Sequence, residues 1–218
     1  MSLAVKPHYW EQARRALARR DPVMRSVIRR CGDAHLEPRG DAFLTLARAI
    51  VGQQISVKAA QSIWNRLAAS AREMTPQRLS RMRPATLQSC GLSGRKVDYL
   101  RELAKGFRDG EVDPSGWSDL DDELVIAELV RLRGIGRWTA EMFLIFNLMR
   151  PDVFPVDDIG VLRAIALNYA DEINGQELQF AGRQSRQAAA QIADRWRPWR
   201  SVATWYLWRS LDPVPVEY

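Results

Sequence analysis

The sequence is poor in the residues that hold metals and disulfides. Its 218 residues include two cysteines, Cys31 and Cys90, and two histidines, His8 and His35. Two cysteines are too few for a disulfide framework or for a site with four thiolate ligands. With so few histidines besides, the sequence predicts neither a zinc centre nor a four-cysteine iron–sulfur cluster.

Long apolar segments are also missing. No run approaches the roughly 20 apolar residues that a membrane helix needs, and residues 1–10 lack the apolar core of a secretion signal. We therefore expect a cytoplasmic protein with no membrane span. The composition is that of a globular protein, because 46% of the residues are hydrophobic and 27% are charged.

The charge balance is basic. Lys and Arg number 32 against 26 Asp and Glu, which gives a formal net charge of +6. A basic protein favours polyanionic partners, because contacts to phosphates release condensed counterions. Many proteins are basic for other reasons, so the case for nucleic-acid binding depends on motifs.

Apolar residues recur at helical spacing along most of the chain. Leu44, Ala47, Ile50 and Val51 follow the i, i+3, i+4 pattern of an amphipathic helix. Further helices are expected over 56–69, 93–107, 120–130, 136–149, 159–169 and 186–195. Pro and Gly separate these segments, and few stretches alternate with the period of a strand. The sequence therefore predicts an all-α fold, in which the loop-like stretch 110–118 could join two lobes.

The most specific segment is Leu132–Ala140, with the sequence LRGIGRWTA. Gly134 and Gly136 allow a tight hairpin between an apolar helix and the next helix. The start of a helix offers unpaired N–H groups and the positive end of the dipole, which together suit a DNA phosphate, and Arg137 adds a cation there. The simpler interpretation is an ordinary turn in which glycines end a helix.

A second informative segment is Asp152–Gly160, with the sequence DVFPVDDIG. It places two adjacent carboxylates, Asp157 and Asp158, directly before a predicted helix. The simpler interpretation is that one of them caps this helix. Asp158 could also combine capping with a chemical role.

These segments resemble the helix-hairpin-helix DNA glycosylases, and among them the bacterial 3-methyladenine DNA glycosylase II, or AlkA, type. The same resemblance includes Ile50–Val57, Cys90–Val97 and Arg195–Ser201, and it runs in the family's order from Phe43 to Trp208. It implies a two-lobed helical fold, with the hairpin unit at about 120–149 and with 1–218 forming a single core of closely packed lobes. The chain ahead of Phe43 is too short for the β-rich domain of the enterobacterial form, so we expect the compact form.

The resemblance implies a role for each matched residue. Asp158 takes the catalytic position, and Trp138, Trp208 and Tyr206 form an aromatic base pocket. The implied DNA contacts are Gly134, Gly136, Arg137, Thr139, Gln53, Gln54, Ser56 and Lys96. Gln54 stands at the intercalating position, where a larger apolar side chain is common in the family. The backbone carbonyls of Val130, Leu132 and Ile135 would hold a monovalent cation, and no other cofactor is implied.

The implied activity is excision of alkylated purines, 3-methyladenine first, from double-stranded DNA by a monomer. Alkylation at purine N3 or N7 gives the base a positive charge, and the face of an indole attracts such a cation by roughly 0.5–2 kcal/mol. Asp158 would stabilise the oxocarbenium-like sugar or orient the attacking water. Bifunctional relatives carry a lysine at the position of Trp138, so we expect a monofunctional enzyme that leaves an abasic site.

Two other functions remain open at this point. A non-catalytic helix-hairpin-helix module that binds DNA would keep the glycines and the basic charge, but would not need Asp158, Trp138 and Trp208 together. A glycosylase for other damaged bases, such as hypoxanthine or ethenoadenine, would keep all of these residues and differ in the shape of its pocket.

Overall fold

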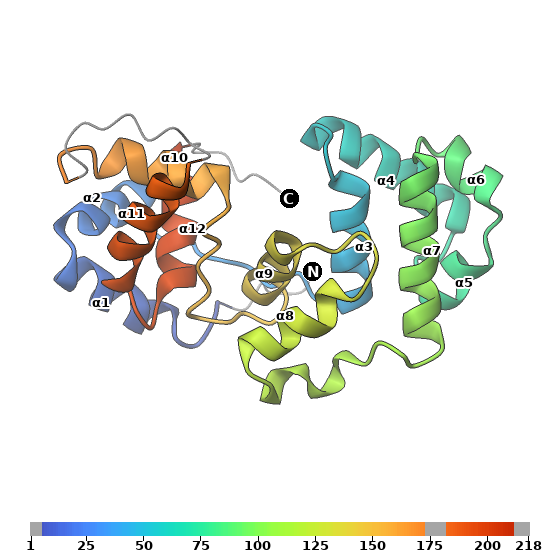
Figure 1. The fold of residues 1–218 in the computed structure, drawn as a ribbon, viewed down its shortest axis with the longest axis horizontal. Helices are drawn as coiled ribbons and strands as arrows, with labels where there is room; N and C mark the ends of the chain where they lie inside the picture. The colour runs from blue at the N-terminus through green and yellow to red at the C-terminus, as the bar shows by residue number, and fades with distance from the viewer. Residues whose placement is uncertain (1–5, 173–181, 212–218) are drawn as a thin grey trace. The chain divides into compact units, whose positions relative to one another are not determined.

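The computed structural model describes residues 6–172 and 182–211, and in these residues it is built of helices without strands (Figure 1). The helices are α1 (Trp10–Arg20), α2 (Pro22–Cys31), α3 (Ala42–Gly52), α4 (Val57–Ala71), α5 (Pro76–Arg81), α6 (Pro84–Ser89), α7 (Gly94–Arg108), the 3-10 helix η1 (Pro114–Asp119), α8 (Asp122–Val130), α9 (Arg137–Phe146), α10 (Ile159–Asn168), α11 (Arg183–Asp194) and α12 (Arg200–Leu211). The predicted all-α fold is confirmed. No helix of the described ranges is long and apolar enough to cross a bilayer.

The chain forms two compact units. Unit 1 contains the described residues up to Pro38 and those from Leu144 onward, and unit 2 contains Arg39–Phe143. The stretch 110–118, expected as a connection between lobes, lies inside unit 2 instead. Its loop-like composition reflects a capped 3-10 helix, in which the Asp113 side chain accepts a hydrogen bond from the Ser115 amide at 2.9 Å. That the two units pack closely into one core stays a prediction.

Unit 1 is organised around α12, which packs against α1, α2 and α10 (Figure 1). Its core contains Trp10 and Trp196, which are fully buried. Asp21 is a buried carboxylate, and it accepts hydrogen bonds from the Met24 amide, the Tyr169 hydroxyl and the Trp196 indole, each at 2.9 Å. Three donors compensate the burial of this charge, so Asp21 joins three segments of the unit rather than opening a site.

Unit 2 is organised around α7, which packs against α3, α5 and α6 (Figure 1). The buried face of α7 carries Val97, Leu100, Leu103 and Ala104, at the spacing of one side of a helix. The unit also contains α8 and the part of α9 up to Phe143, and residues 131–136 join these two helices. The hairpin lies beside α7, because a Cβ on Gly134 would meet the ring of Tyr99, a residue of that helix.

The prolines read as separators begin two short helices that the periodicity did not predict. Pro76 and Pro84 occupy the first positions of α5 and α6. Proline suits this position, because its fixed φ is helical and the amide it lacks would have no partner in the helix. Thr75 caps α5 by accepting the Arg78 amide.

Candidate functional site

The hairpin between α8 and α9 requires glycine at position 134. Gly134 has a φ of +88°, and the Ile135 amide donates to the Leu132 carbonyl at 3.0 Å to close the turn. A Cβ on Gly134 would lie 2.6 Å from Cγ of Tyr99 and closer still to its Cδ2. A Cβ on Gly136 would meet nothing within 4 Å. Gly134 therefore shapes the turn, whereas Gly136 leaves the start of α9 uncovered.

Two side chains of unit 2 tie the hairpin to the end of α3. The Gln53 side-chain amide donates to the Gly134 carbonyl at 2.7 Å. The Lys96 ammonium donates to the carbonyls of Val51 and Gln53 at 2.8 and 2.7 Å, and burial lowers the pKa of Lys96. Both side chains that were expected to contact DNA are engaged within the protein. A direct DNA contact by either would have to use their remaining donors.

Arg137 links the two helices of the hairpin. Its guanidinium donates to Glu123 of α8 at 2.9 Å and to Glu141 of α9 at 3.1 Å. The hydrogen bonds to Glu123, followed by the coulombic attraction of both carboxylates, raise the pKa of Arg137 above its ordinary value. Two carboxylates therefore balance the cation that the sequence assigned to a phosphate. Thr139 is buried, so a contact from it to DNA would use its backbone amide.

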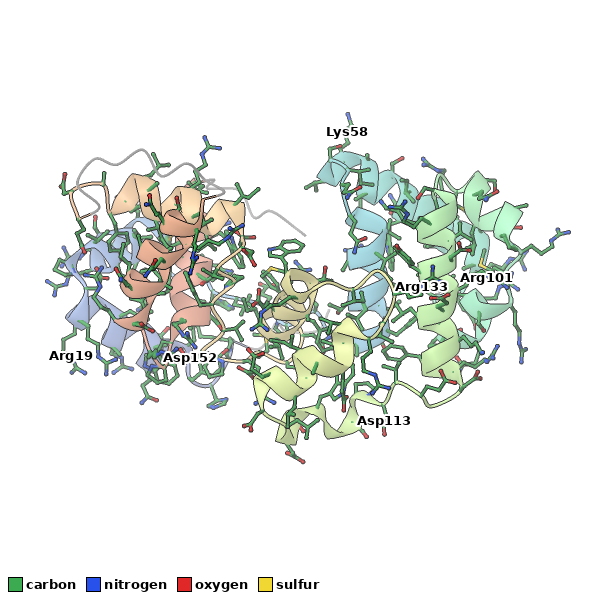
Figure 2. The ribbon with its side chains drawn as sticks, in the orientation of Figure 1. Arg19, Lys58, Arg101, Asp113, Arg133 and Asp152 are labelled. Atoms are coloured by element: carbon green, nitrogen blue, oxygen red, sulfur yellow. The ribbon has the colours of Figure 1, made fainter. Side chains whose placement is uncertain are left out.

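Arg133 is the hairpin's other paired cation. It donates to Glu102 of α7, and its guanidinium lies 5.7 Å from the centre of the Tyr99 ring. Figure 2 labels Arg133 at the hairpin, next to α7. These contacts connect the turn to α7, next to the close approach of Gly134 to the Tyr99 ring. Of the three carbonyls expected to bind a cation, that of Leu132 already accepts the Ile135 amide, and the cation stays a prediction.

The loop between α3 and α4 exposes apolar side chains at its tip. Gln54 is exposed with a φ of +58°, and next to it Ile55 is 38% exposed and Val57 50% exposed. Ser56 caps α4 by accepting the Ala59 amide at 3.3 Å. Lys58 follows in the first turn of α4 (Figure 2). The sequence pointed to Gln54 and not to Ile55, because the exposure of Ile55 depends on the direction that the loop takes.

In unit 1, Asp158 caps α10. Its Oδ1 accepts the Val161 amide at 2.7 Å and the Trp208 indole N–H at 2.9 Å, and the residue is only 7% exposed. The capping interpretation is therefore correct locally, and it fixes the carboxylate in one orientation. A Cβ on Gly160 would lie 3.0 Å from the same oxygen, so glycine leaves room for it.

One face of Trp208 is already covered. Its ring stacks on Phe146, the last residue of α9, with centroids 5.7 Å apart and an interplanar angle of 14°. A base stacking on Trp208 would have to use the opposite face. Phe146 carried no signal in the sequence beyond its place in an apolar helix, so sequence reasoning missed this contact.

The two adjacent carboxylates have different surroundings. Asp157 is 55% exposed and forms an ion pair with Arg186 of α11 at 2.6 Å. Asp158 is buried, and its Oδ1 accepts the Val161 amide and the Trp208 indole N–H. The positive charge of Arg186 thus lies against Asp157, so a buried carboxylate with an indole beside it remains as the candidate for chemistry.

Comparisons with known proteins agree with this arrangement. The model of the family described as HhH-GPD superfamily base excision DNA repair protein matches residues 47–180. This chain belongs to the HhH-GPD superfamily. It is 32% identical over 174 residues to the DNA-3-methyladenine glycosylase 1 of Schizosaccharomyces pombe, covering 78% of this chain and 72% of that protein. Two curated relatives from Bacillus subtilis are longer, and the chain spans 58% and 65% of their lengths.

Solved structures of superfamily members have the same fold. The crystal structure of a DNA-3-methyladenine glycosidase from Bacillus halodurans matches with a TM-score of 0.77 and 31% identity, covering 90% of this chain and 87% of that one. The Schizosaccharomyces pombe 3-methyladenine DNA glycosylase in complex with abasic DNA matches with a TM-score of 0.79 and 27% identity, covering 94% of this chain and all of that chain. The predicted helix-hairpin-helix glycosylase fold is thereby confirmed.

The predicted place of Tyr206 in the base pocket of this superfamily member is wrong. Tyr206 is 0% exposed and packs against Trp10 and Trp205, with ring centroids 5.6 and 5.1 Å away. Burial raises the pKa of Tyr206 to about 12. Side chains two positions apart on a helix point about 200° away from each other, so Tyr206 faces the core when Trp208 faces Asp158. Tyr206 belongs to the core of unit 1 and does not line a pocket.

Trp138 and Trp208 lie in different units. Trp138 is half-buried in the first turn of α9 in unit 2, and Trp208 lies on α12 in unit 1. Their shared lining of one base pocket therefore stays a prediction.

Proposed function

We propose that the chain is a monofunctional DNA glycosylase that hydrolyses the N-glycosidic bond of alkylated purines in double-stranded DNA, 3-methyladenine first, and leaves an abasic site. The observation that carries the proposal is the pair formed by Asp158 and Trp208, a buried carboxylate joined at 2.9 Å to an indole N–H. Relatives named as 3-methyladenine glycosylases support the substrate class. We infer that the protein works as a monomer in the cytoplasm.

The proposed reaction begins when the damaged nucleotide leaves the stack, which costs a few kcal/mol and least for a damaged or mispaired base. The bond between C1′ and the base nitrogen then breaks, and its electron pair neutralises the positive charge of the alkylated purine. The sugar becomes an oxocarbenium-like cation, which the Asp158 carboxylate stabilises. A water oxygen attacks C1′, and its proton passes to the carboxylate or to solvent.

The hairpin has a separate task in this proposal. The uncovered start of α9 at Gly136 presents backbone N–H groups to one DNA phosphate, as helix N-termini generally can. The exposed tip of the loop between α3 and α4, at Gln54 and Ile55, would contact the duplex beside the damaged base. The carbonyls of Val130, Leu132 and Ile135 would hold a monovalent cation that screens the phosphate, and the chemistry takes place elsewhere.

The test measures release of free bases from methylated duplex DNA by the wild type and by Asp158→Asn. We expect the wild type to release 3-methyladenine and the variant to lose about 100- to 1,000-fold in rate, the loss typical when one group that stabilises developing charge is removed. Both proteins should bind duplex DNA equally. Borohydride should trap no covalent complex, because Trp138 cannot form a Schiff base.

Three other outcomes would each change the proposed activity. Binding without base release from alkylated, deaminated or oxidised duplexes would favour a non-catalytic module. Release of hypoxanthine or ethenoadenine but not of 3-methyladenine would keep the enzyme class and change the substrate. A trapped adduct would refute the monofunctional mechanism.

A further inference from the structure

The loop that leads to Asp158 is clamped at its far end by the turn between α11 and α12. The Asp152 carboxylate accepts from Arg200 three times: from Nε at 2.8 Å, from a terminal guanidinium nitrogen at 3.0 Å and from the backbone amide at 3.2 Å. Arg197 donates to the same carboxylate at 3.2 Å. Figure 2 labels Asp152 beside this turn. We call the Asp152–Arg200 contact the clamp.

Backbone contacts continue the clamp into the loop. The Ser201 amide donates to the Pro151 carbonyl at 3.0 Å, and the Val153 amide donates to the Ser201 hydroxyl at 2.9 Å. Ser201 is fully buried and Val153 is 6% exposed. The start of the loop therefore has its polar groups bonded to the first residues of α12.

The same helix holds the other end of the loop. Trp208 lies eight residues after Arg200 on α12 and donates to Asp158 at 2.9 Å. Eight residues of an α-helix span about 12 Å with little flexibility. One rigid helix thus fixes both the beginning of the loop, at Asp152, and its end, at Asp158.

We propose that the clamp is a positioning element for Asp158, in which Asp152 and Arg200 set where the carboxylate sits without touching the substrate. The inference rests on the proposed function for the role of Asp158. In this chain the Arg-Pro-Trp-Arg-Ser segment and the aspartate loop are joined by hydrogen bonds, to which the segment contributes Arg197, Arg200 and Ser201.

An ordinary surface ion pair would not have this effect. Exposed pairs contribute little to stability, because water and salt screen the two charges and fixing both long side chains in one geometry costs entropy. In the clamp, the Arg200 and Asp152 side chains are 18% and 24% exposed, and the guanidinium grips the carboxylate through two nitrogens. Such bidentate contacts fix geometry as well as charge. The Asp152 carboxylate also faces the amide at the start of α12, where a negative charge is favourable.

The first experiment compares Asp152→Asn and Arg200→Lys with the wild type. Lysine keeps the charge of Arg200 but cannot grip two oxygens at once. We expect the single-turnover rate of base excision to fall about 10- to 100-fold, because displacement of a reacting group by about 1 Å costs up to 100-fold. Affinity for a duplex containing an abasic-site analogue should stay within about twofold, since the loss concerns the chemical step.

A matched control comes from the same unit. Glu172 forms an ion pair with Arg195 at 2.9 Å, and it has no bond to the aspartate loop. Glu172→Gln should leave the excision rate unchanged. In a background of Asp158→Asn, Asp152→Asn should cause no further loss, because a residue that acts through another is not additive with it. A further loss of the same size in that background would overturn the proposal.

A second readout does not depend on glycosylase activity. The indole N–H of Trp208 gives one resonance among those of eight tryptophans, and Trp208→Phe identifies it. Because this N–H is bonded to Asp158, loosening of the loop should shift it in Asp152→Asn and Arg200→Lys but not in Glu172→Gln. An unmoved signal in both clamp variants refutes the clamp. A shifted signal in a protein that releases no base keeps the clamp and refutes the proposed function instead.

Discussion

Replacing Gly134 by alanine tests the hairpin most directly. At a φ of +88° an L residue is strained, which costs roughly 1–2 kcal/mol. The new Cβ would also enter the Tyr99 ring, 2.6 Å from its Cγ, and overpacking of this kind costs typically 1–3 kcal/mol. We expect Gly134→Ala to lower the free energy of unfolding by about 2–5 kcal/mol and to weaken DNA binding.

Urea denaturation followed by circular dichroism measures the loss, with Gly136→Ala as the matched control. A Cβ at Gly136 meets nothing within 4 Å, so this variant should remain within about 0.5 kcal/mol of the wild type in stability. Removing the ring should relieve part of the cost, so Gly134→Ala should destabilise Tyr99→Ala by only about 1–2 kcal/mol. Equal stability of the two single glycine variants would refute the reasoning.

The remaining predictions concern the loop, the cations and the indole. Ile55→Ser should slow excision from a fully paired duplex more than from a mismatched one, because flipping a base out of a paired site costs more free energy. Equal slowing on both duplexes would mean that Ile55 does not help to flip the base. Gln54→Ala in the same assay compares the two residues at the tip of the loop. Arg137→Gln should lower stability but leave the salt dependence of DNA binding unchanged, whereas a slope reduced by about 0.9 would mean that Arg137 contacts a phosphate. Lys96→Met should cost about 1–3 kcal/mol of stability in thermal or urea unfolding, because it leaves two backbone carbonyls without their donor; an unchanged midpoint would contradict this. Trp208→Phe should slow base release while keeping Asp158 as a helix cap, so wild-type rates in this variant would show that the indole N–H is dispensable.

The spacing of apolar residues predicted most of the helices. Most predicted helices lie where the periodicity placed them, and 93–107 became α7 at Gly94–Arg108. The segment 136–149 ends early, at Phe146, because Met149 takes a φ of +55° and the Arg150 amide folds back to the Leu144 carbonyl. A non-glycine residue with positive φ leaves no pattern in the sequence, so this end could not be read from it.

The sequence identified the main residues of the candidate site, but it did not identify the partners that several of them bind. The motifs identified Asp158 and Trp208, which the structure joins by a hydrogen bond. The motifs also assigned Arg137 and Lys96 to DNA, although Arg137 pairs with carboxylates and Lys96 binds carbonyls. The Arg137–Glu141 pair is local, but the bonds of Arg137 to Glu123 and of Lys96 to the carbonyls of residues 51 and 53 depend on how separate segments pack. Tyr206 failed for a related reason, because its side of α12 is set by packing against Trp10.

The capping and catalytic interpretations of Asp158 are two consequences of one geometry. Capping fixes the carboxylate through the Val161 amide, and the indole of Trp208 fixes it from a second direction. Asparagine caps helices about as well as aspartate, and its side-chain oxygen can accept the same two donors. Asp158→Asn should therefore remove the charge and keep the fold. A large loss of base excision with an unchanged unfolding midpoint would assign the chemistry to the charge, whereas a parallel loss of both would mean that capping alone explains the residue.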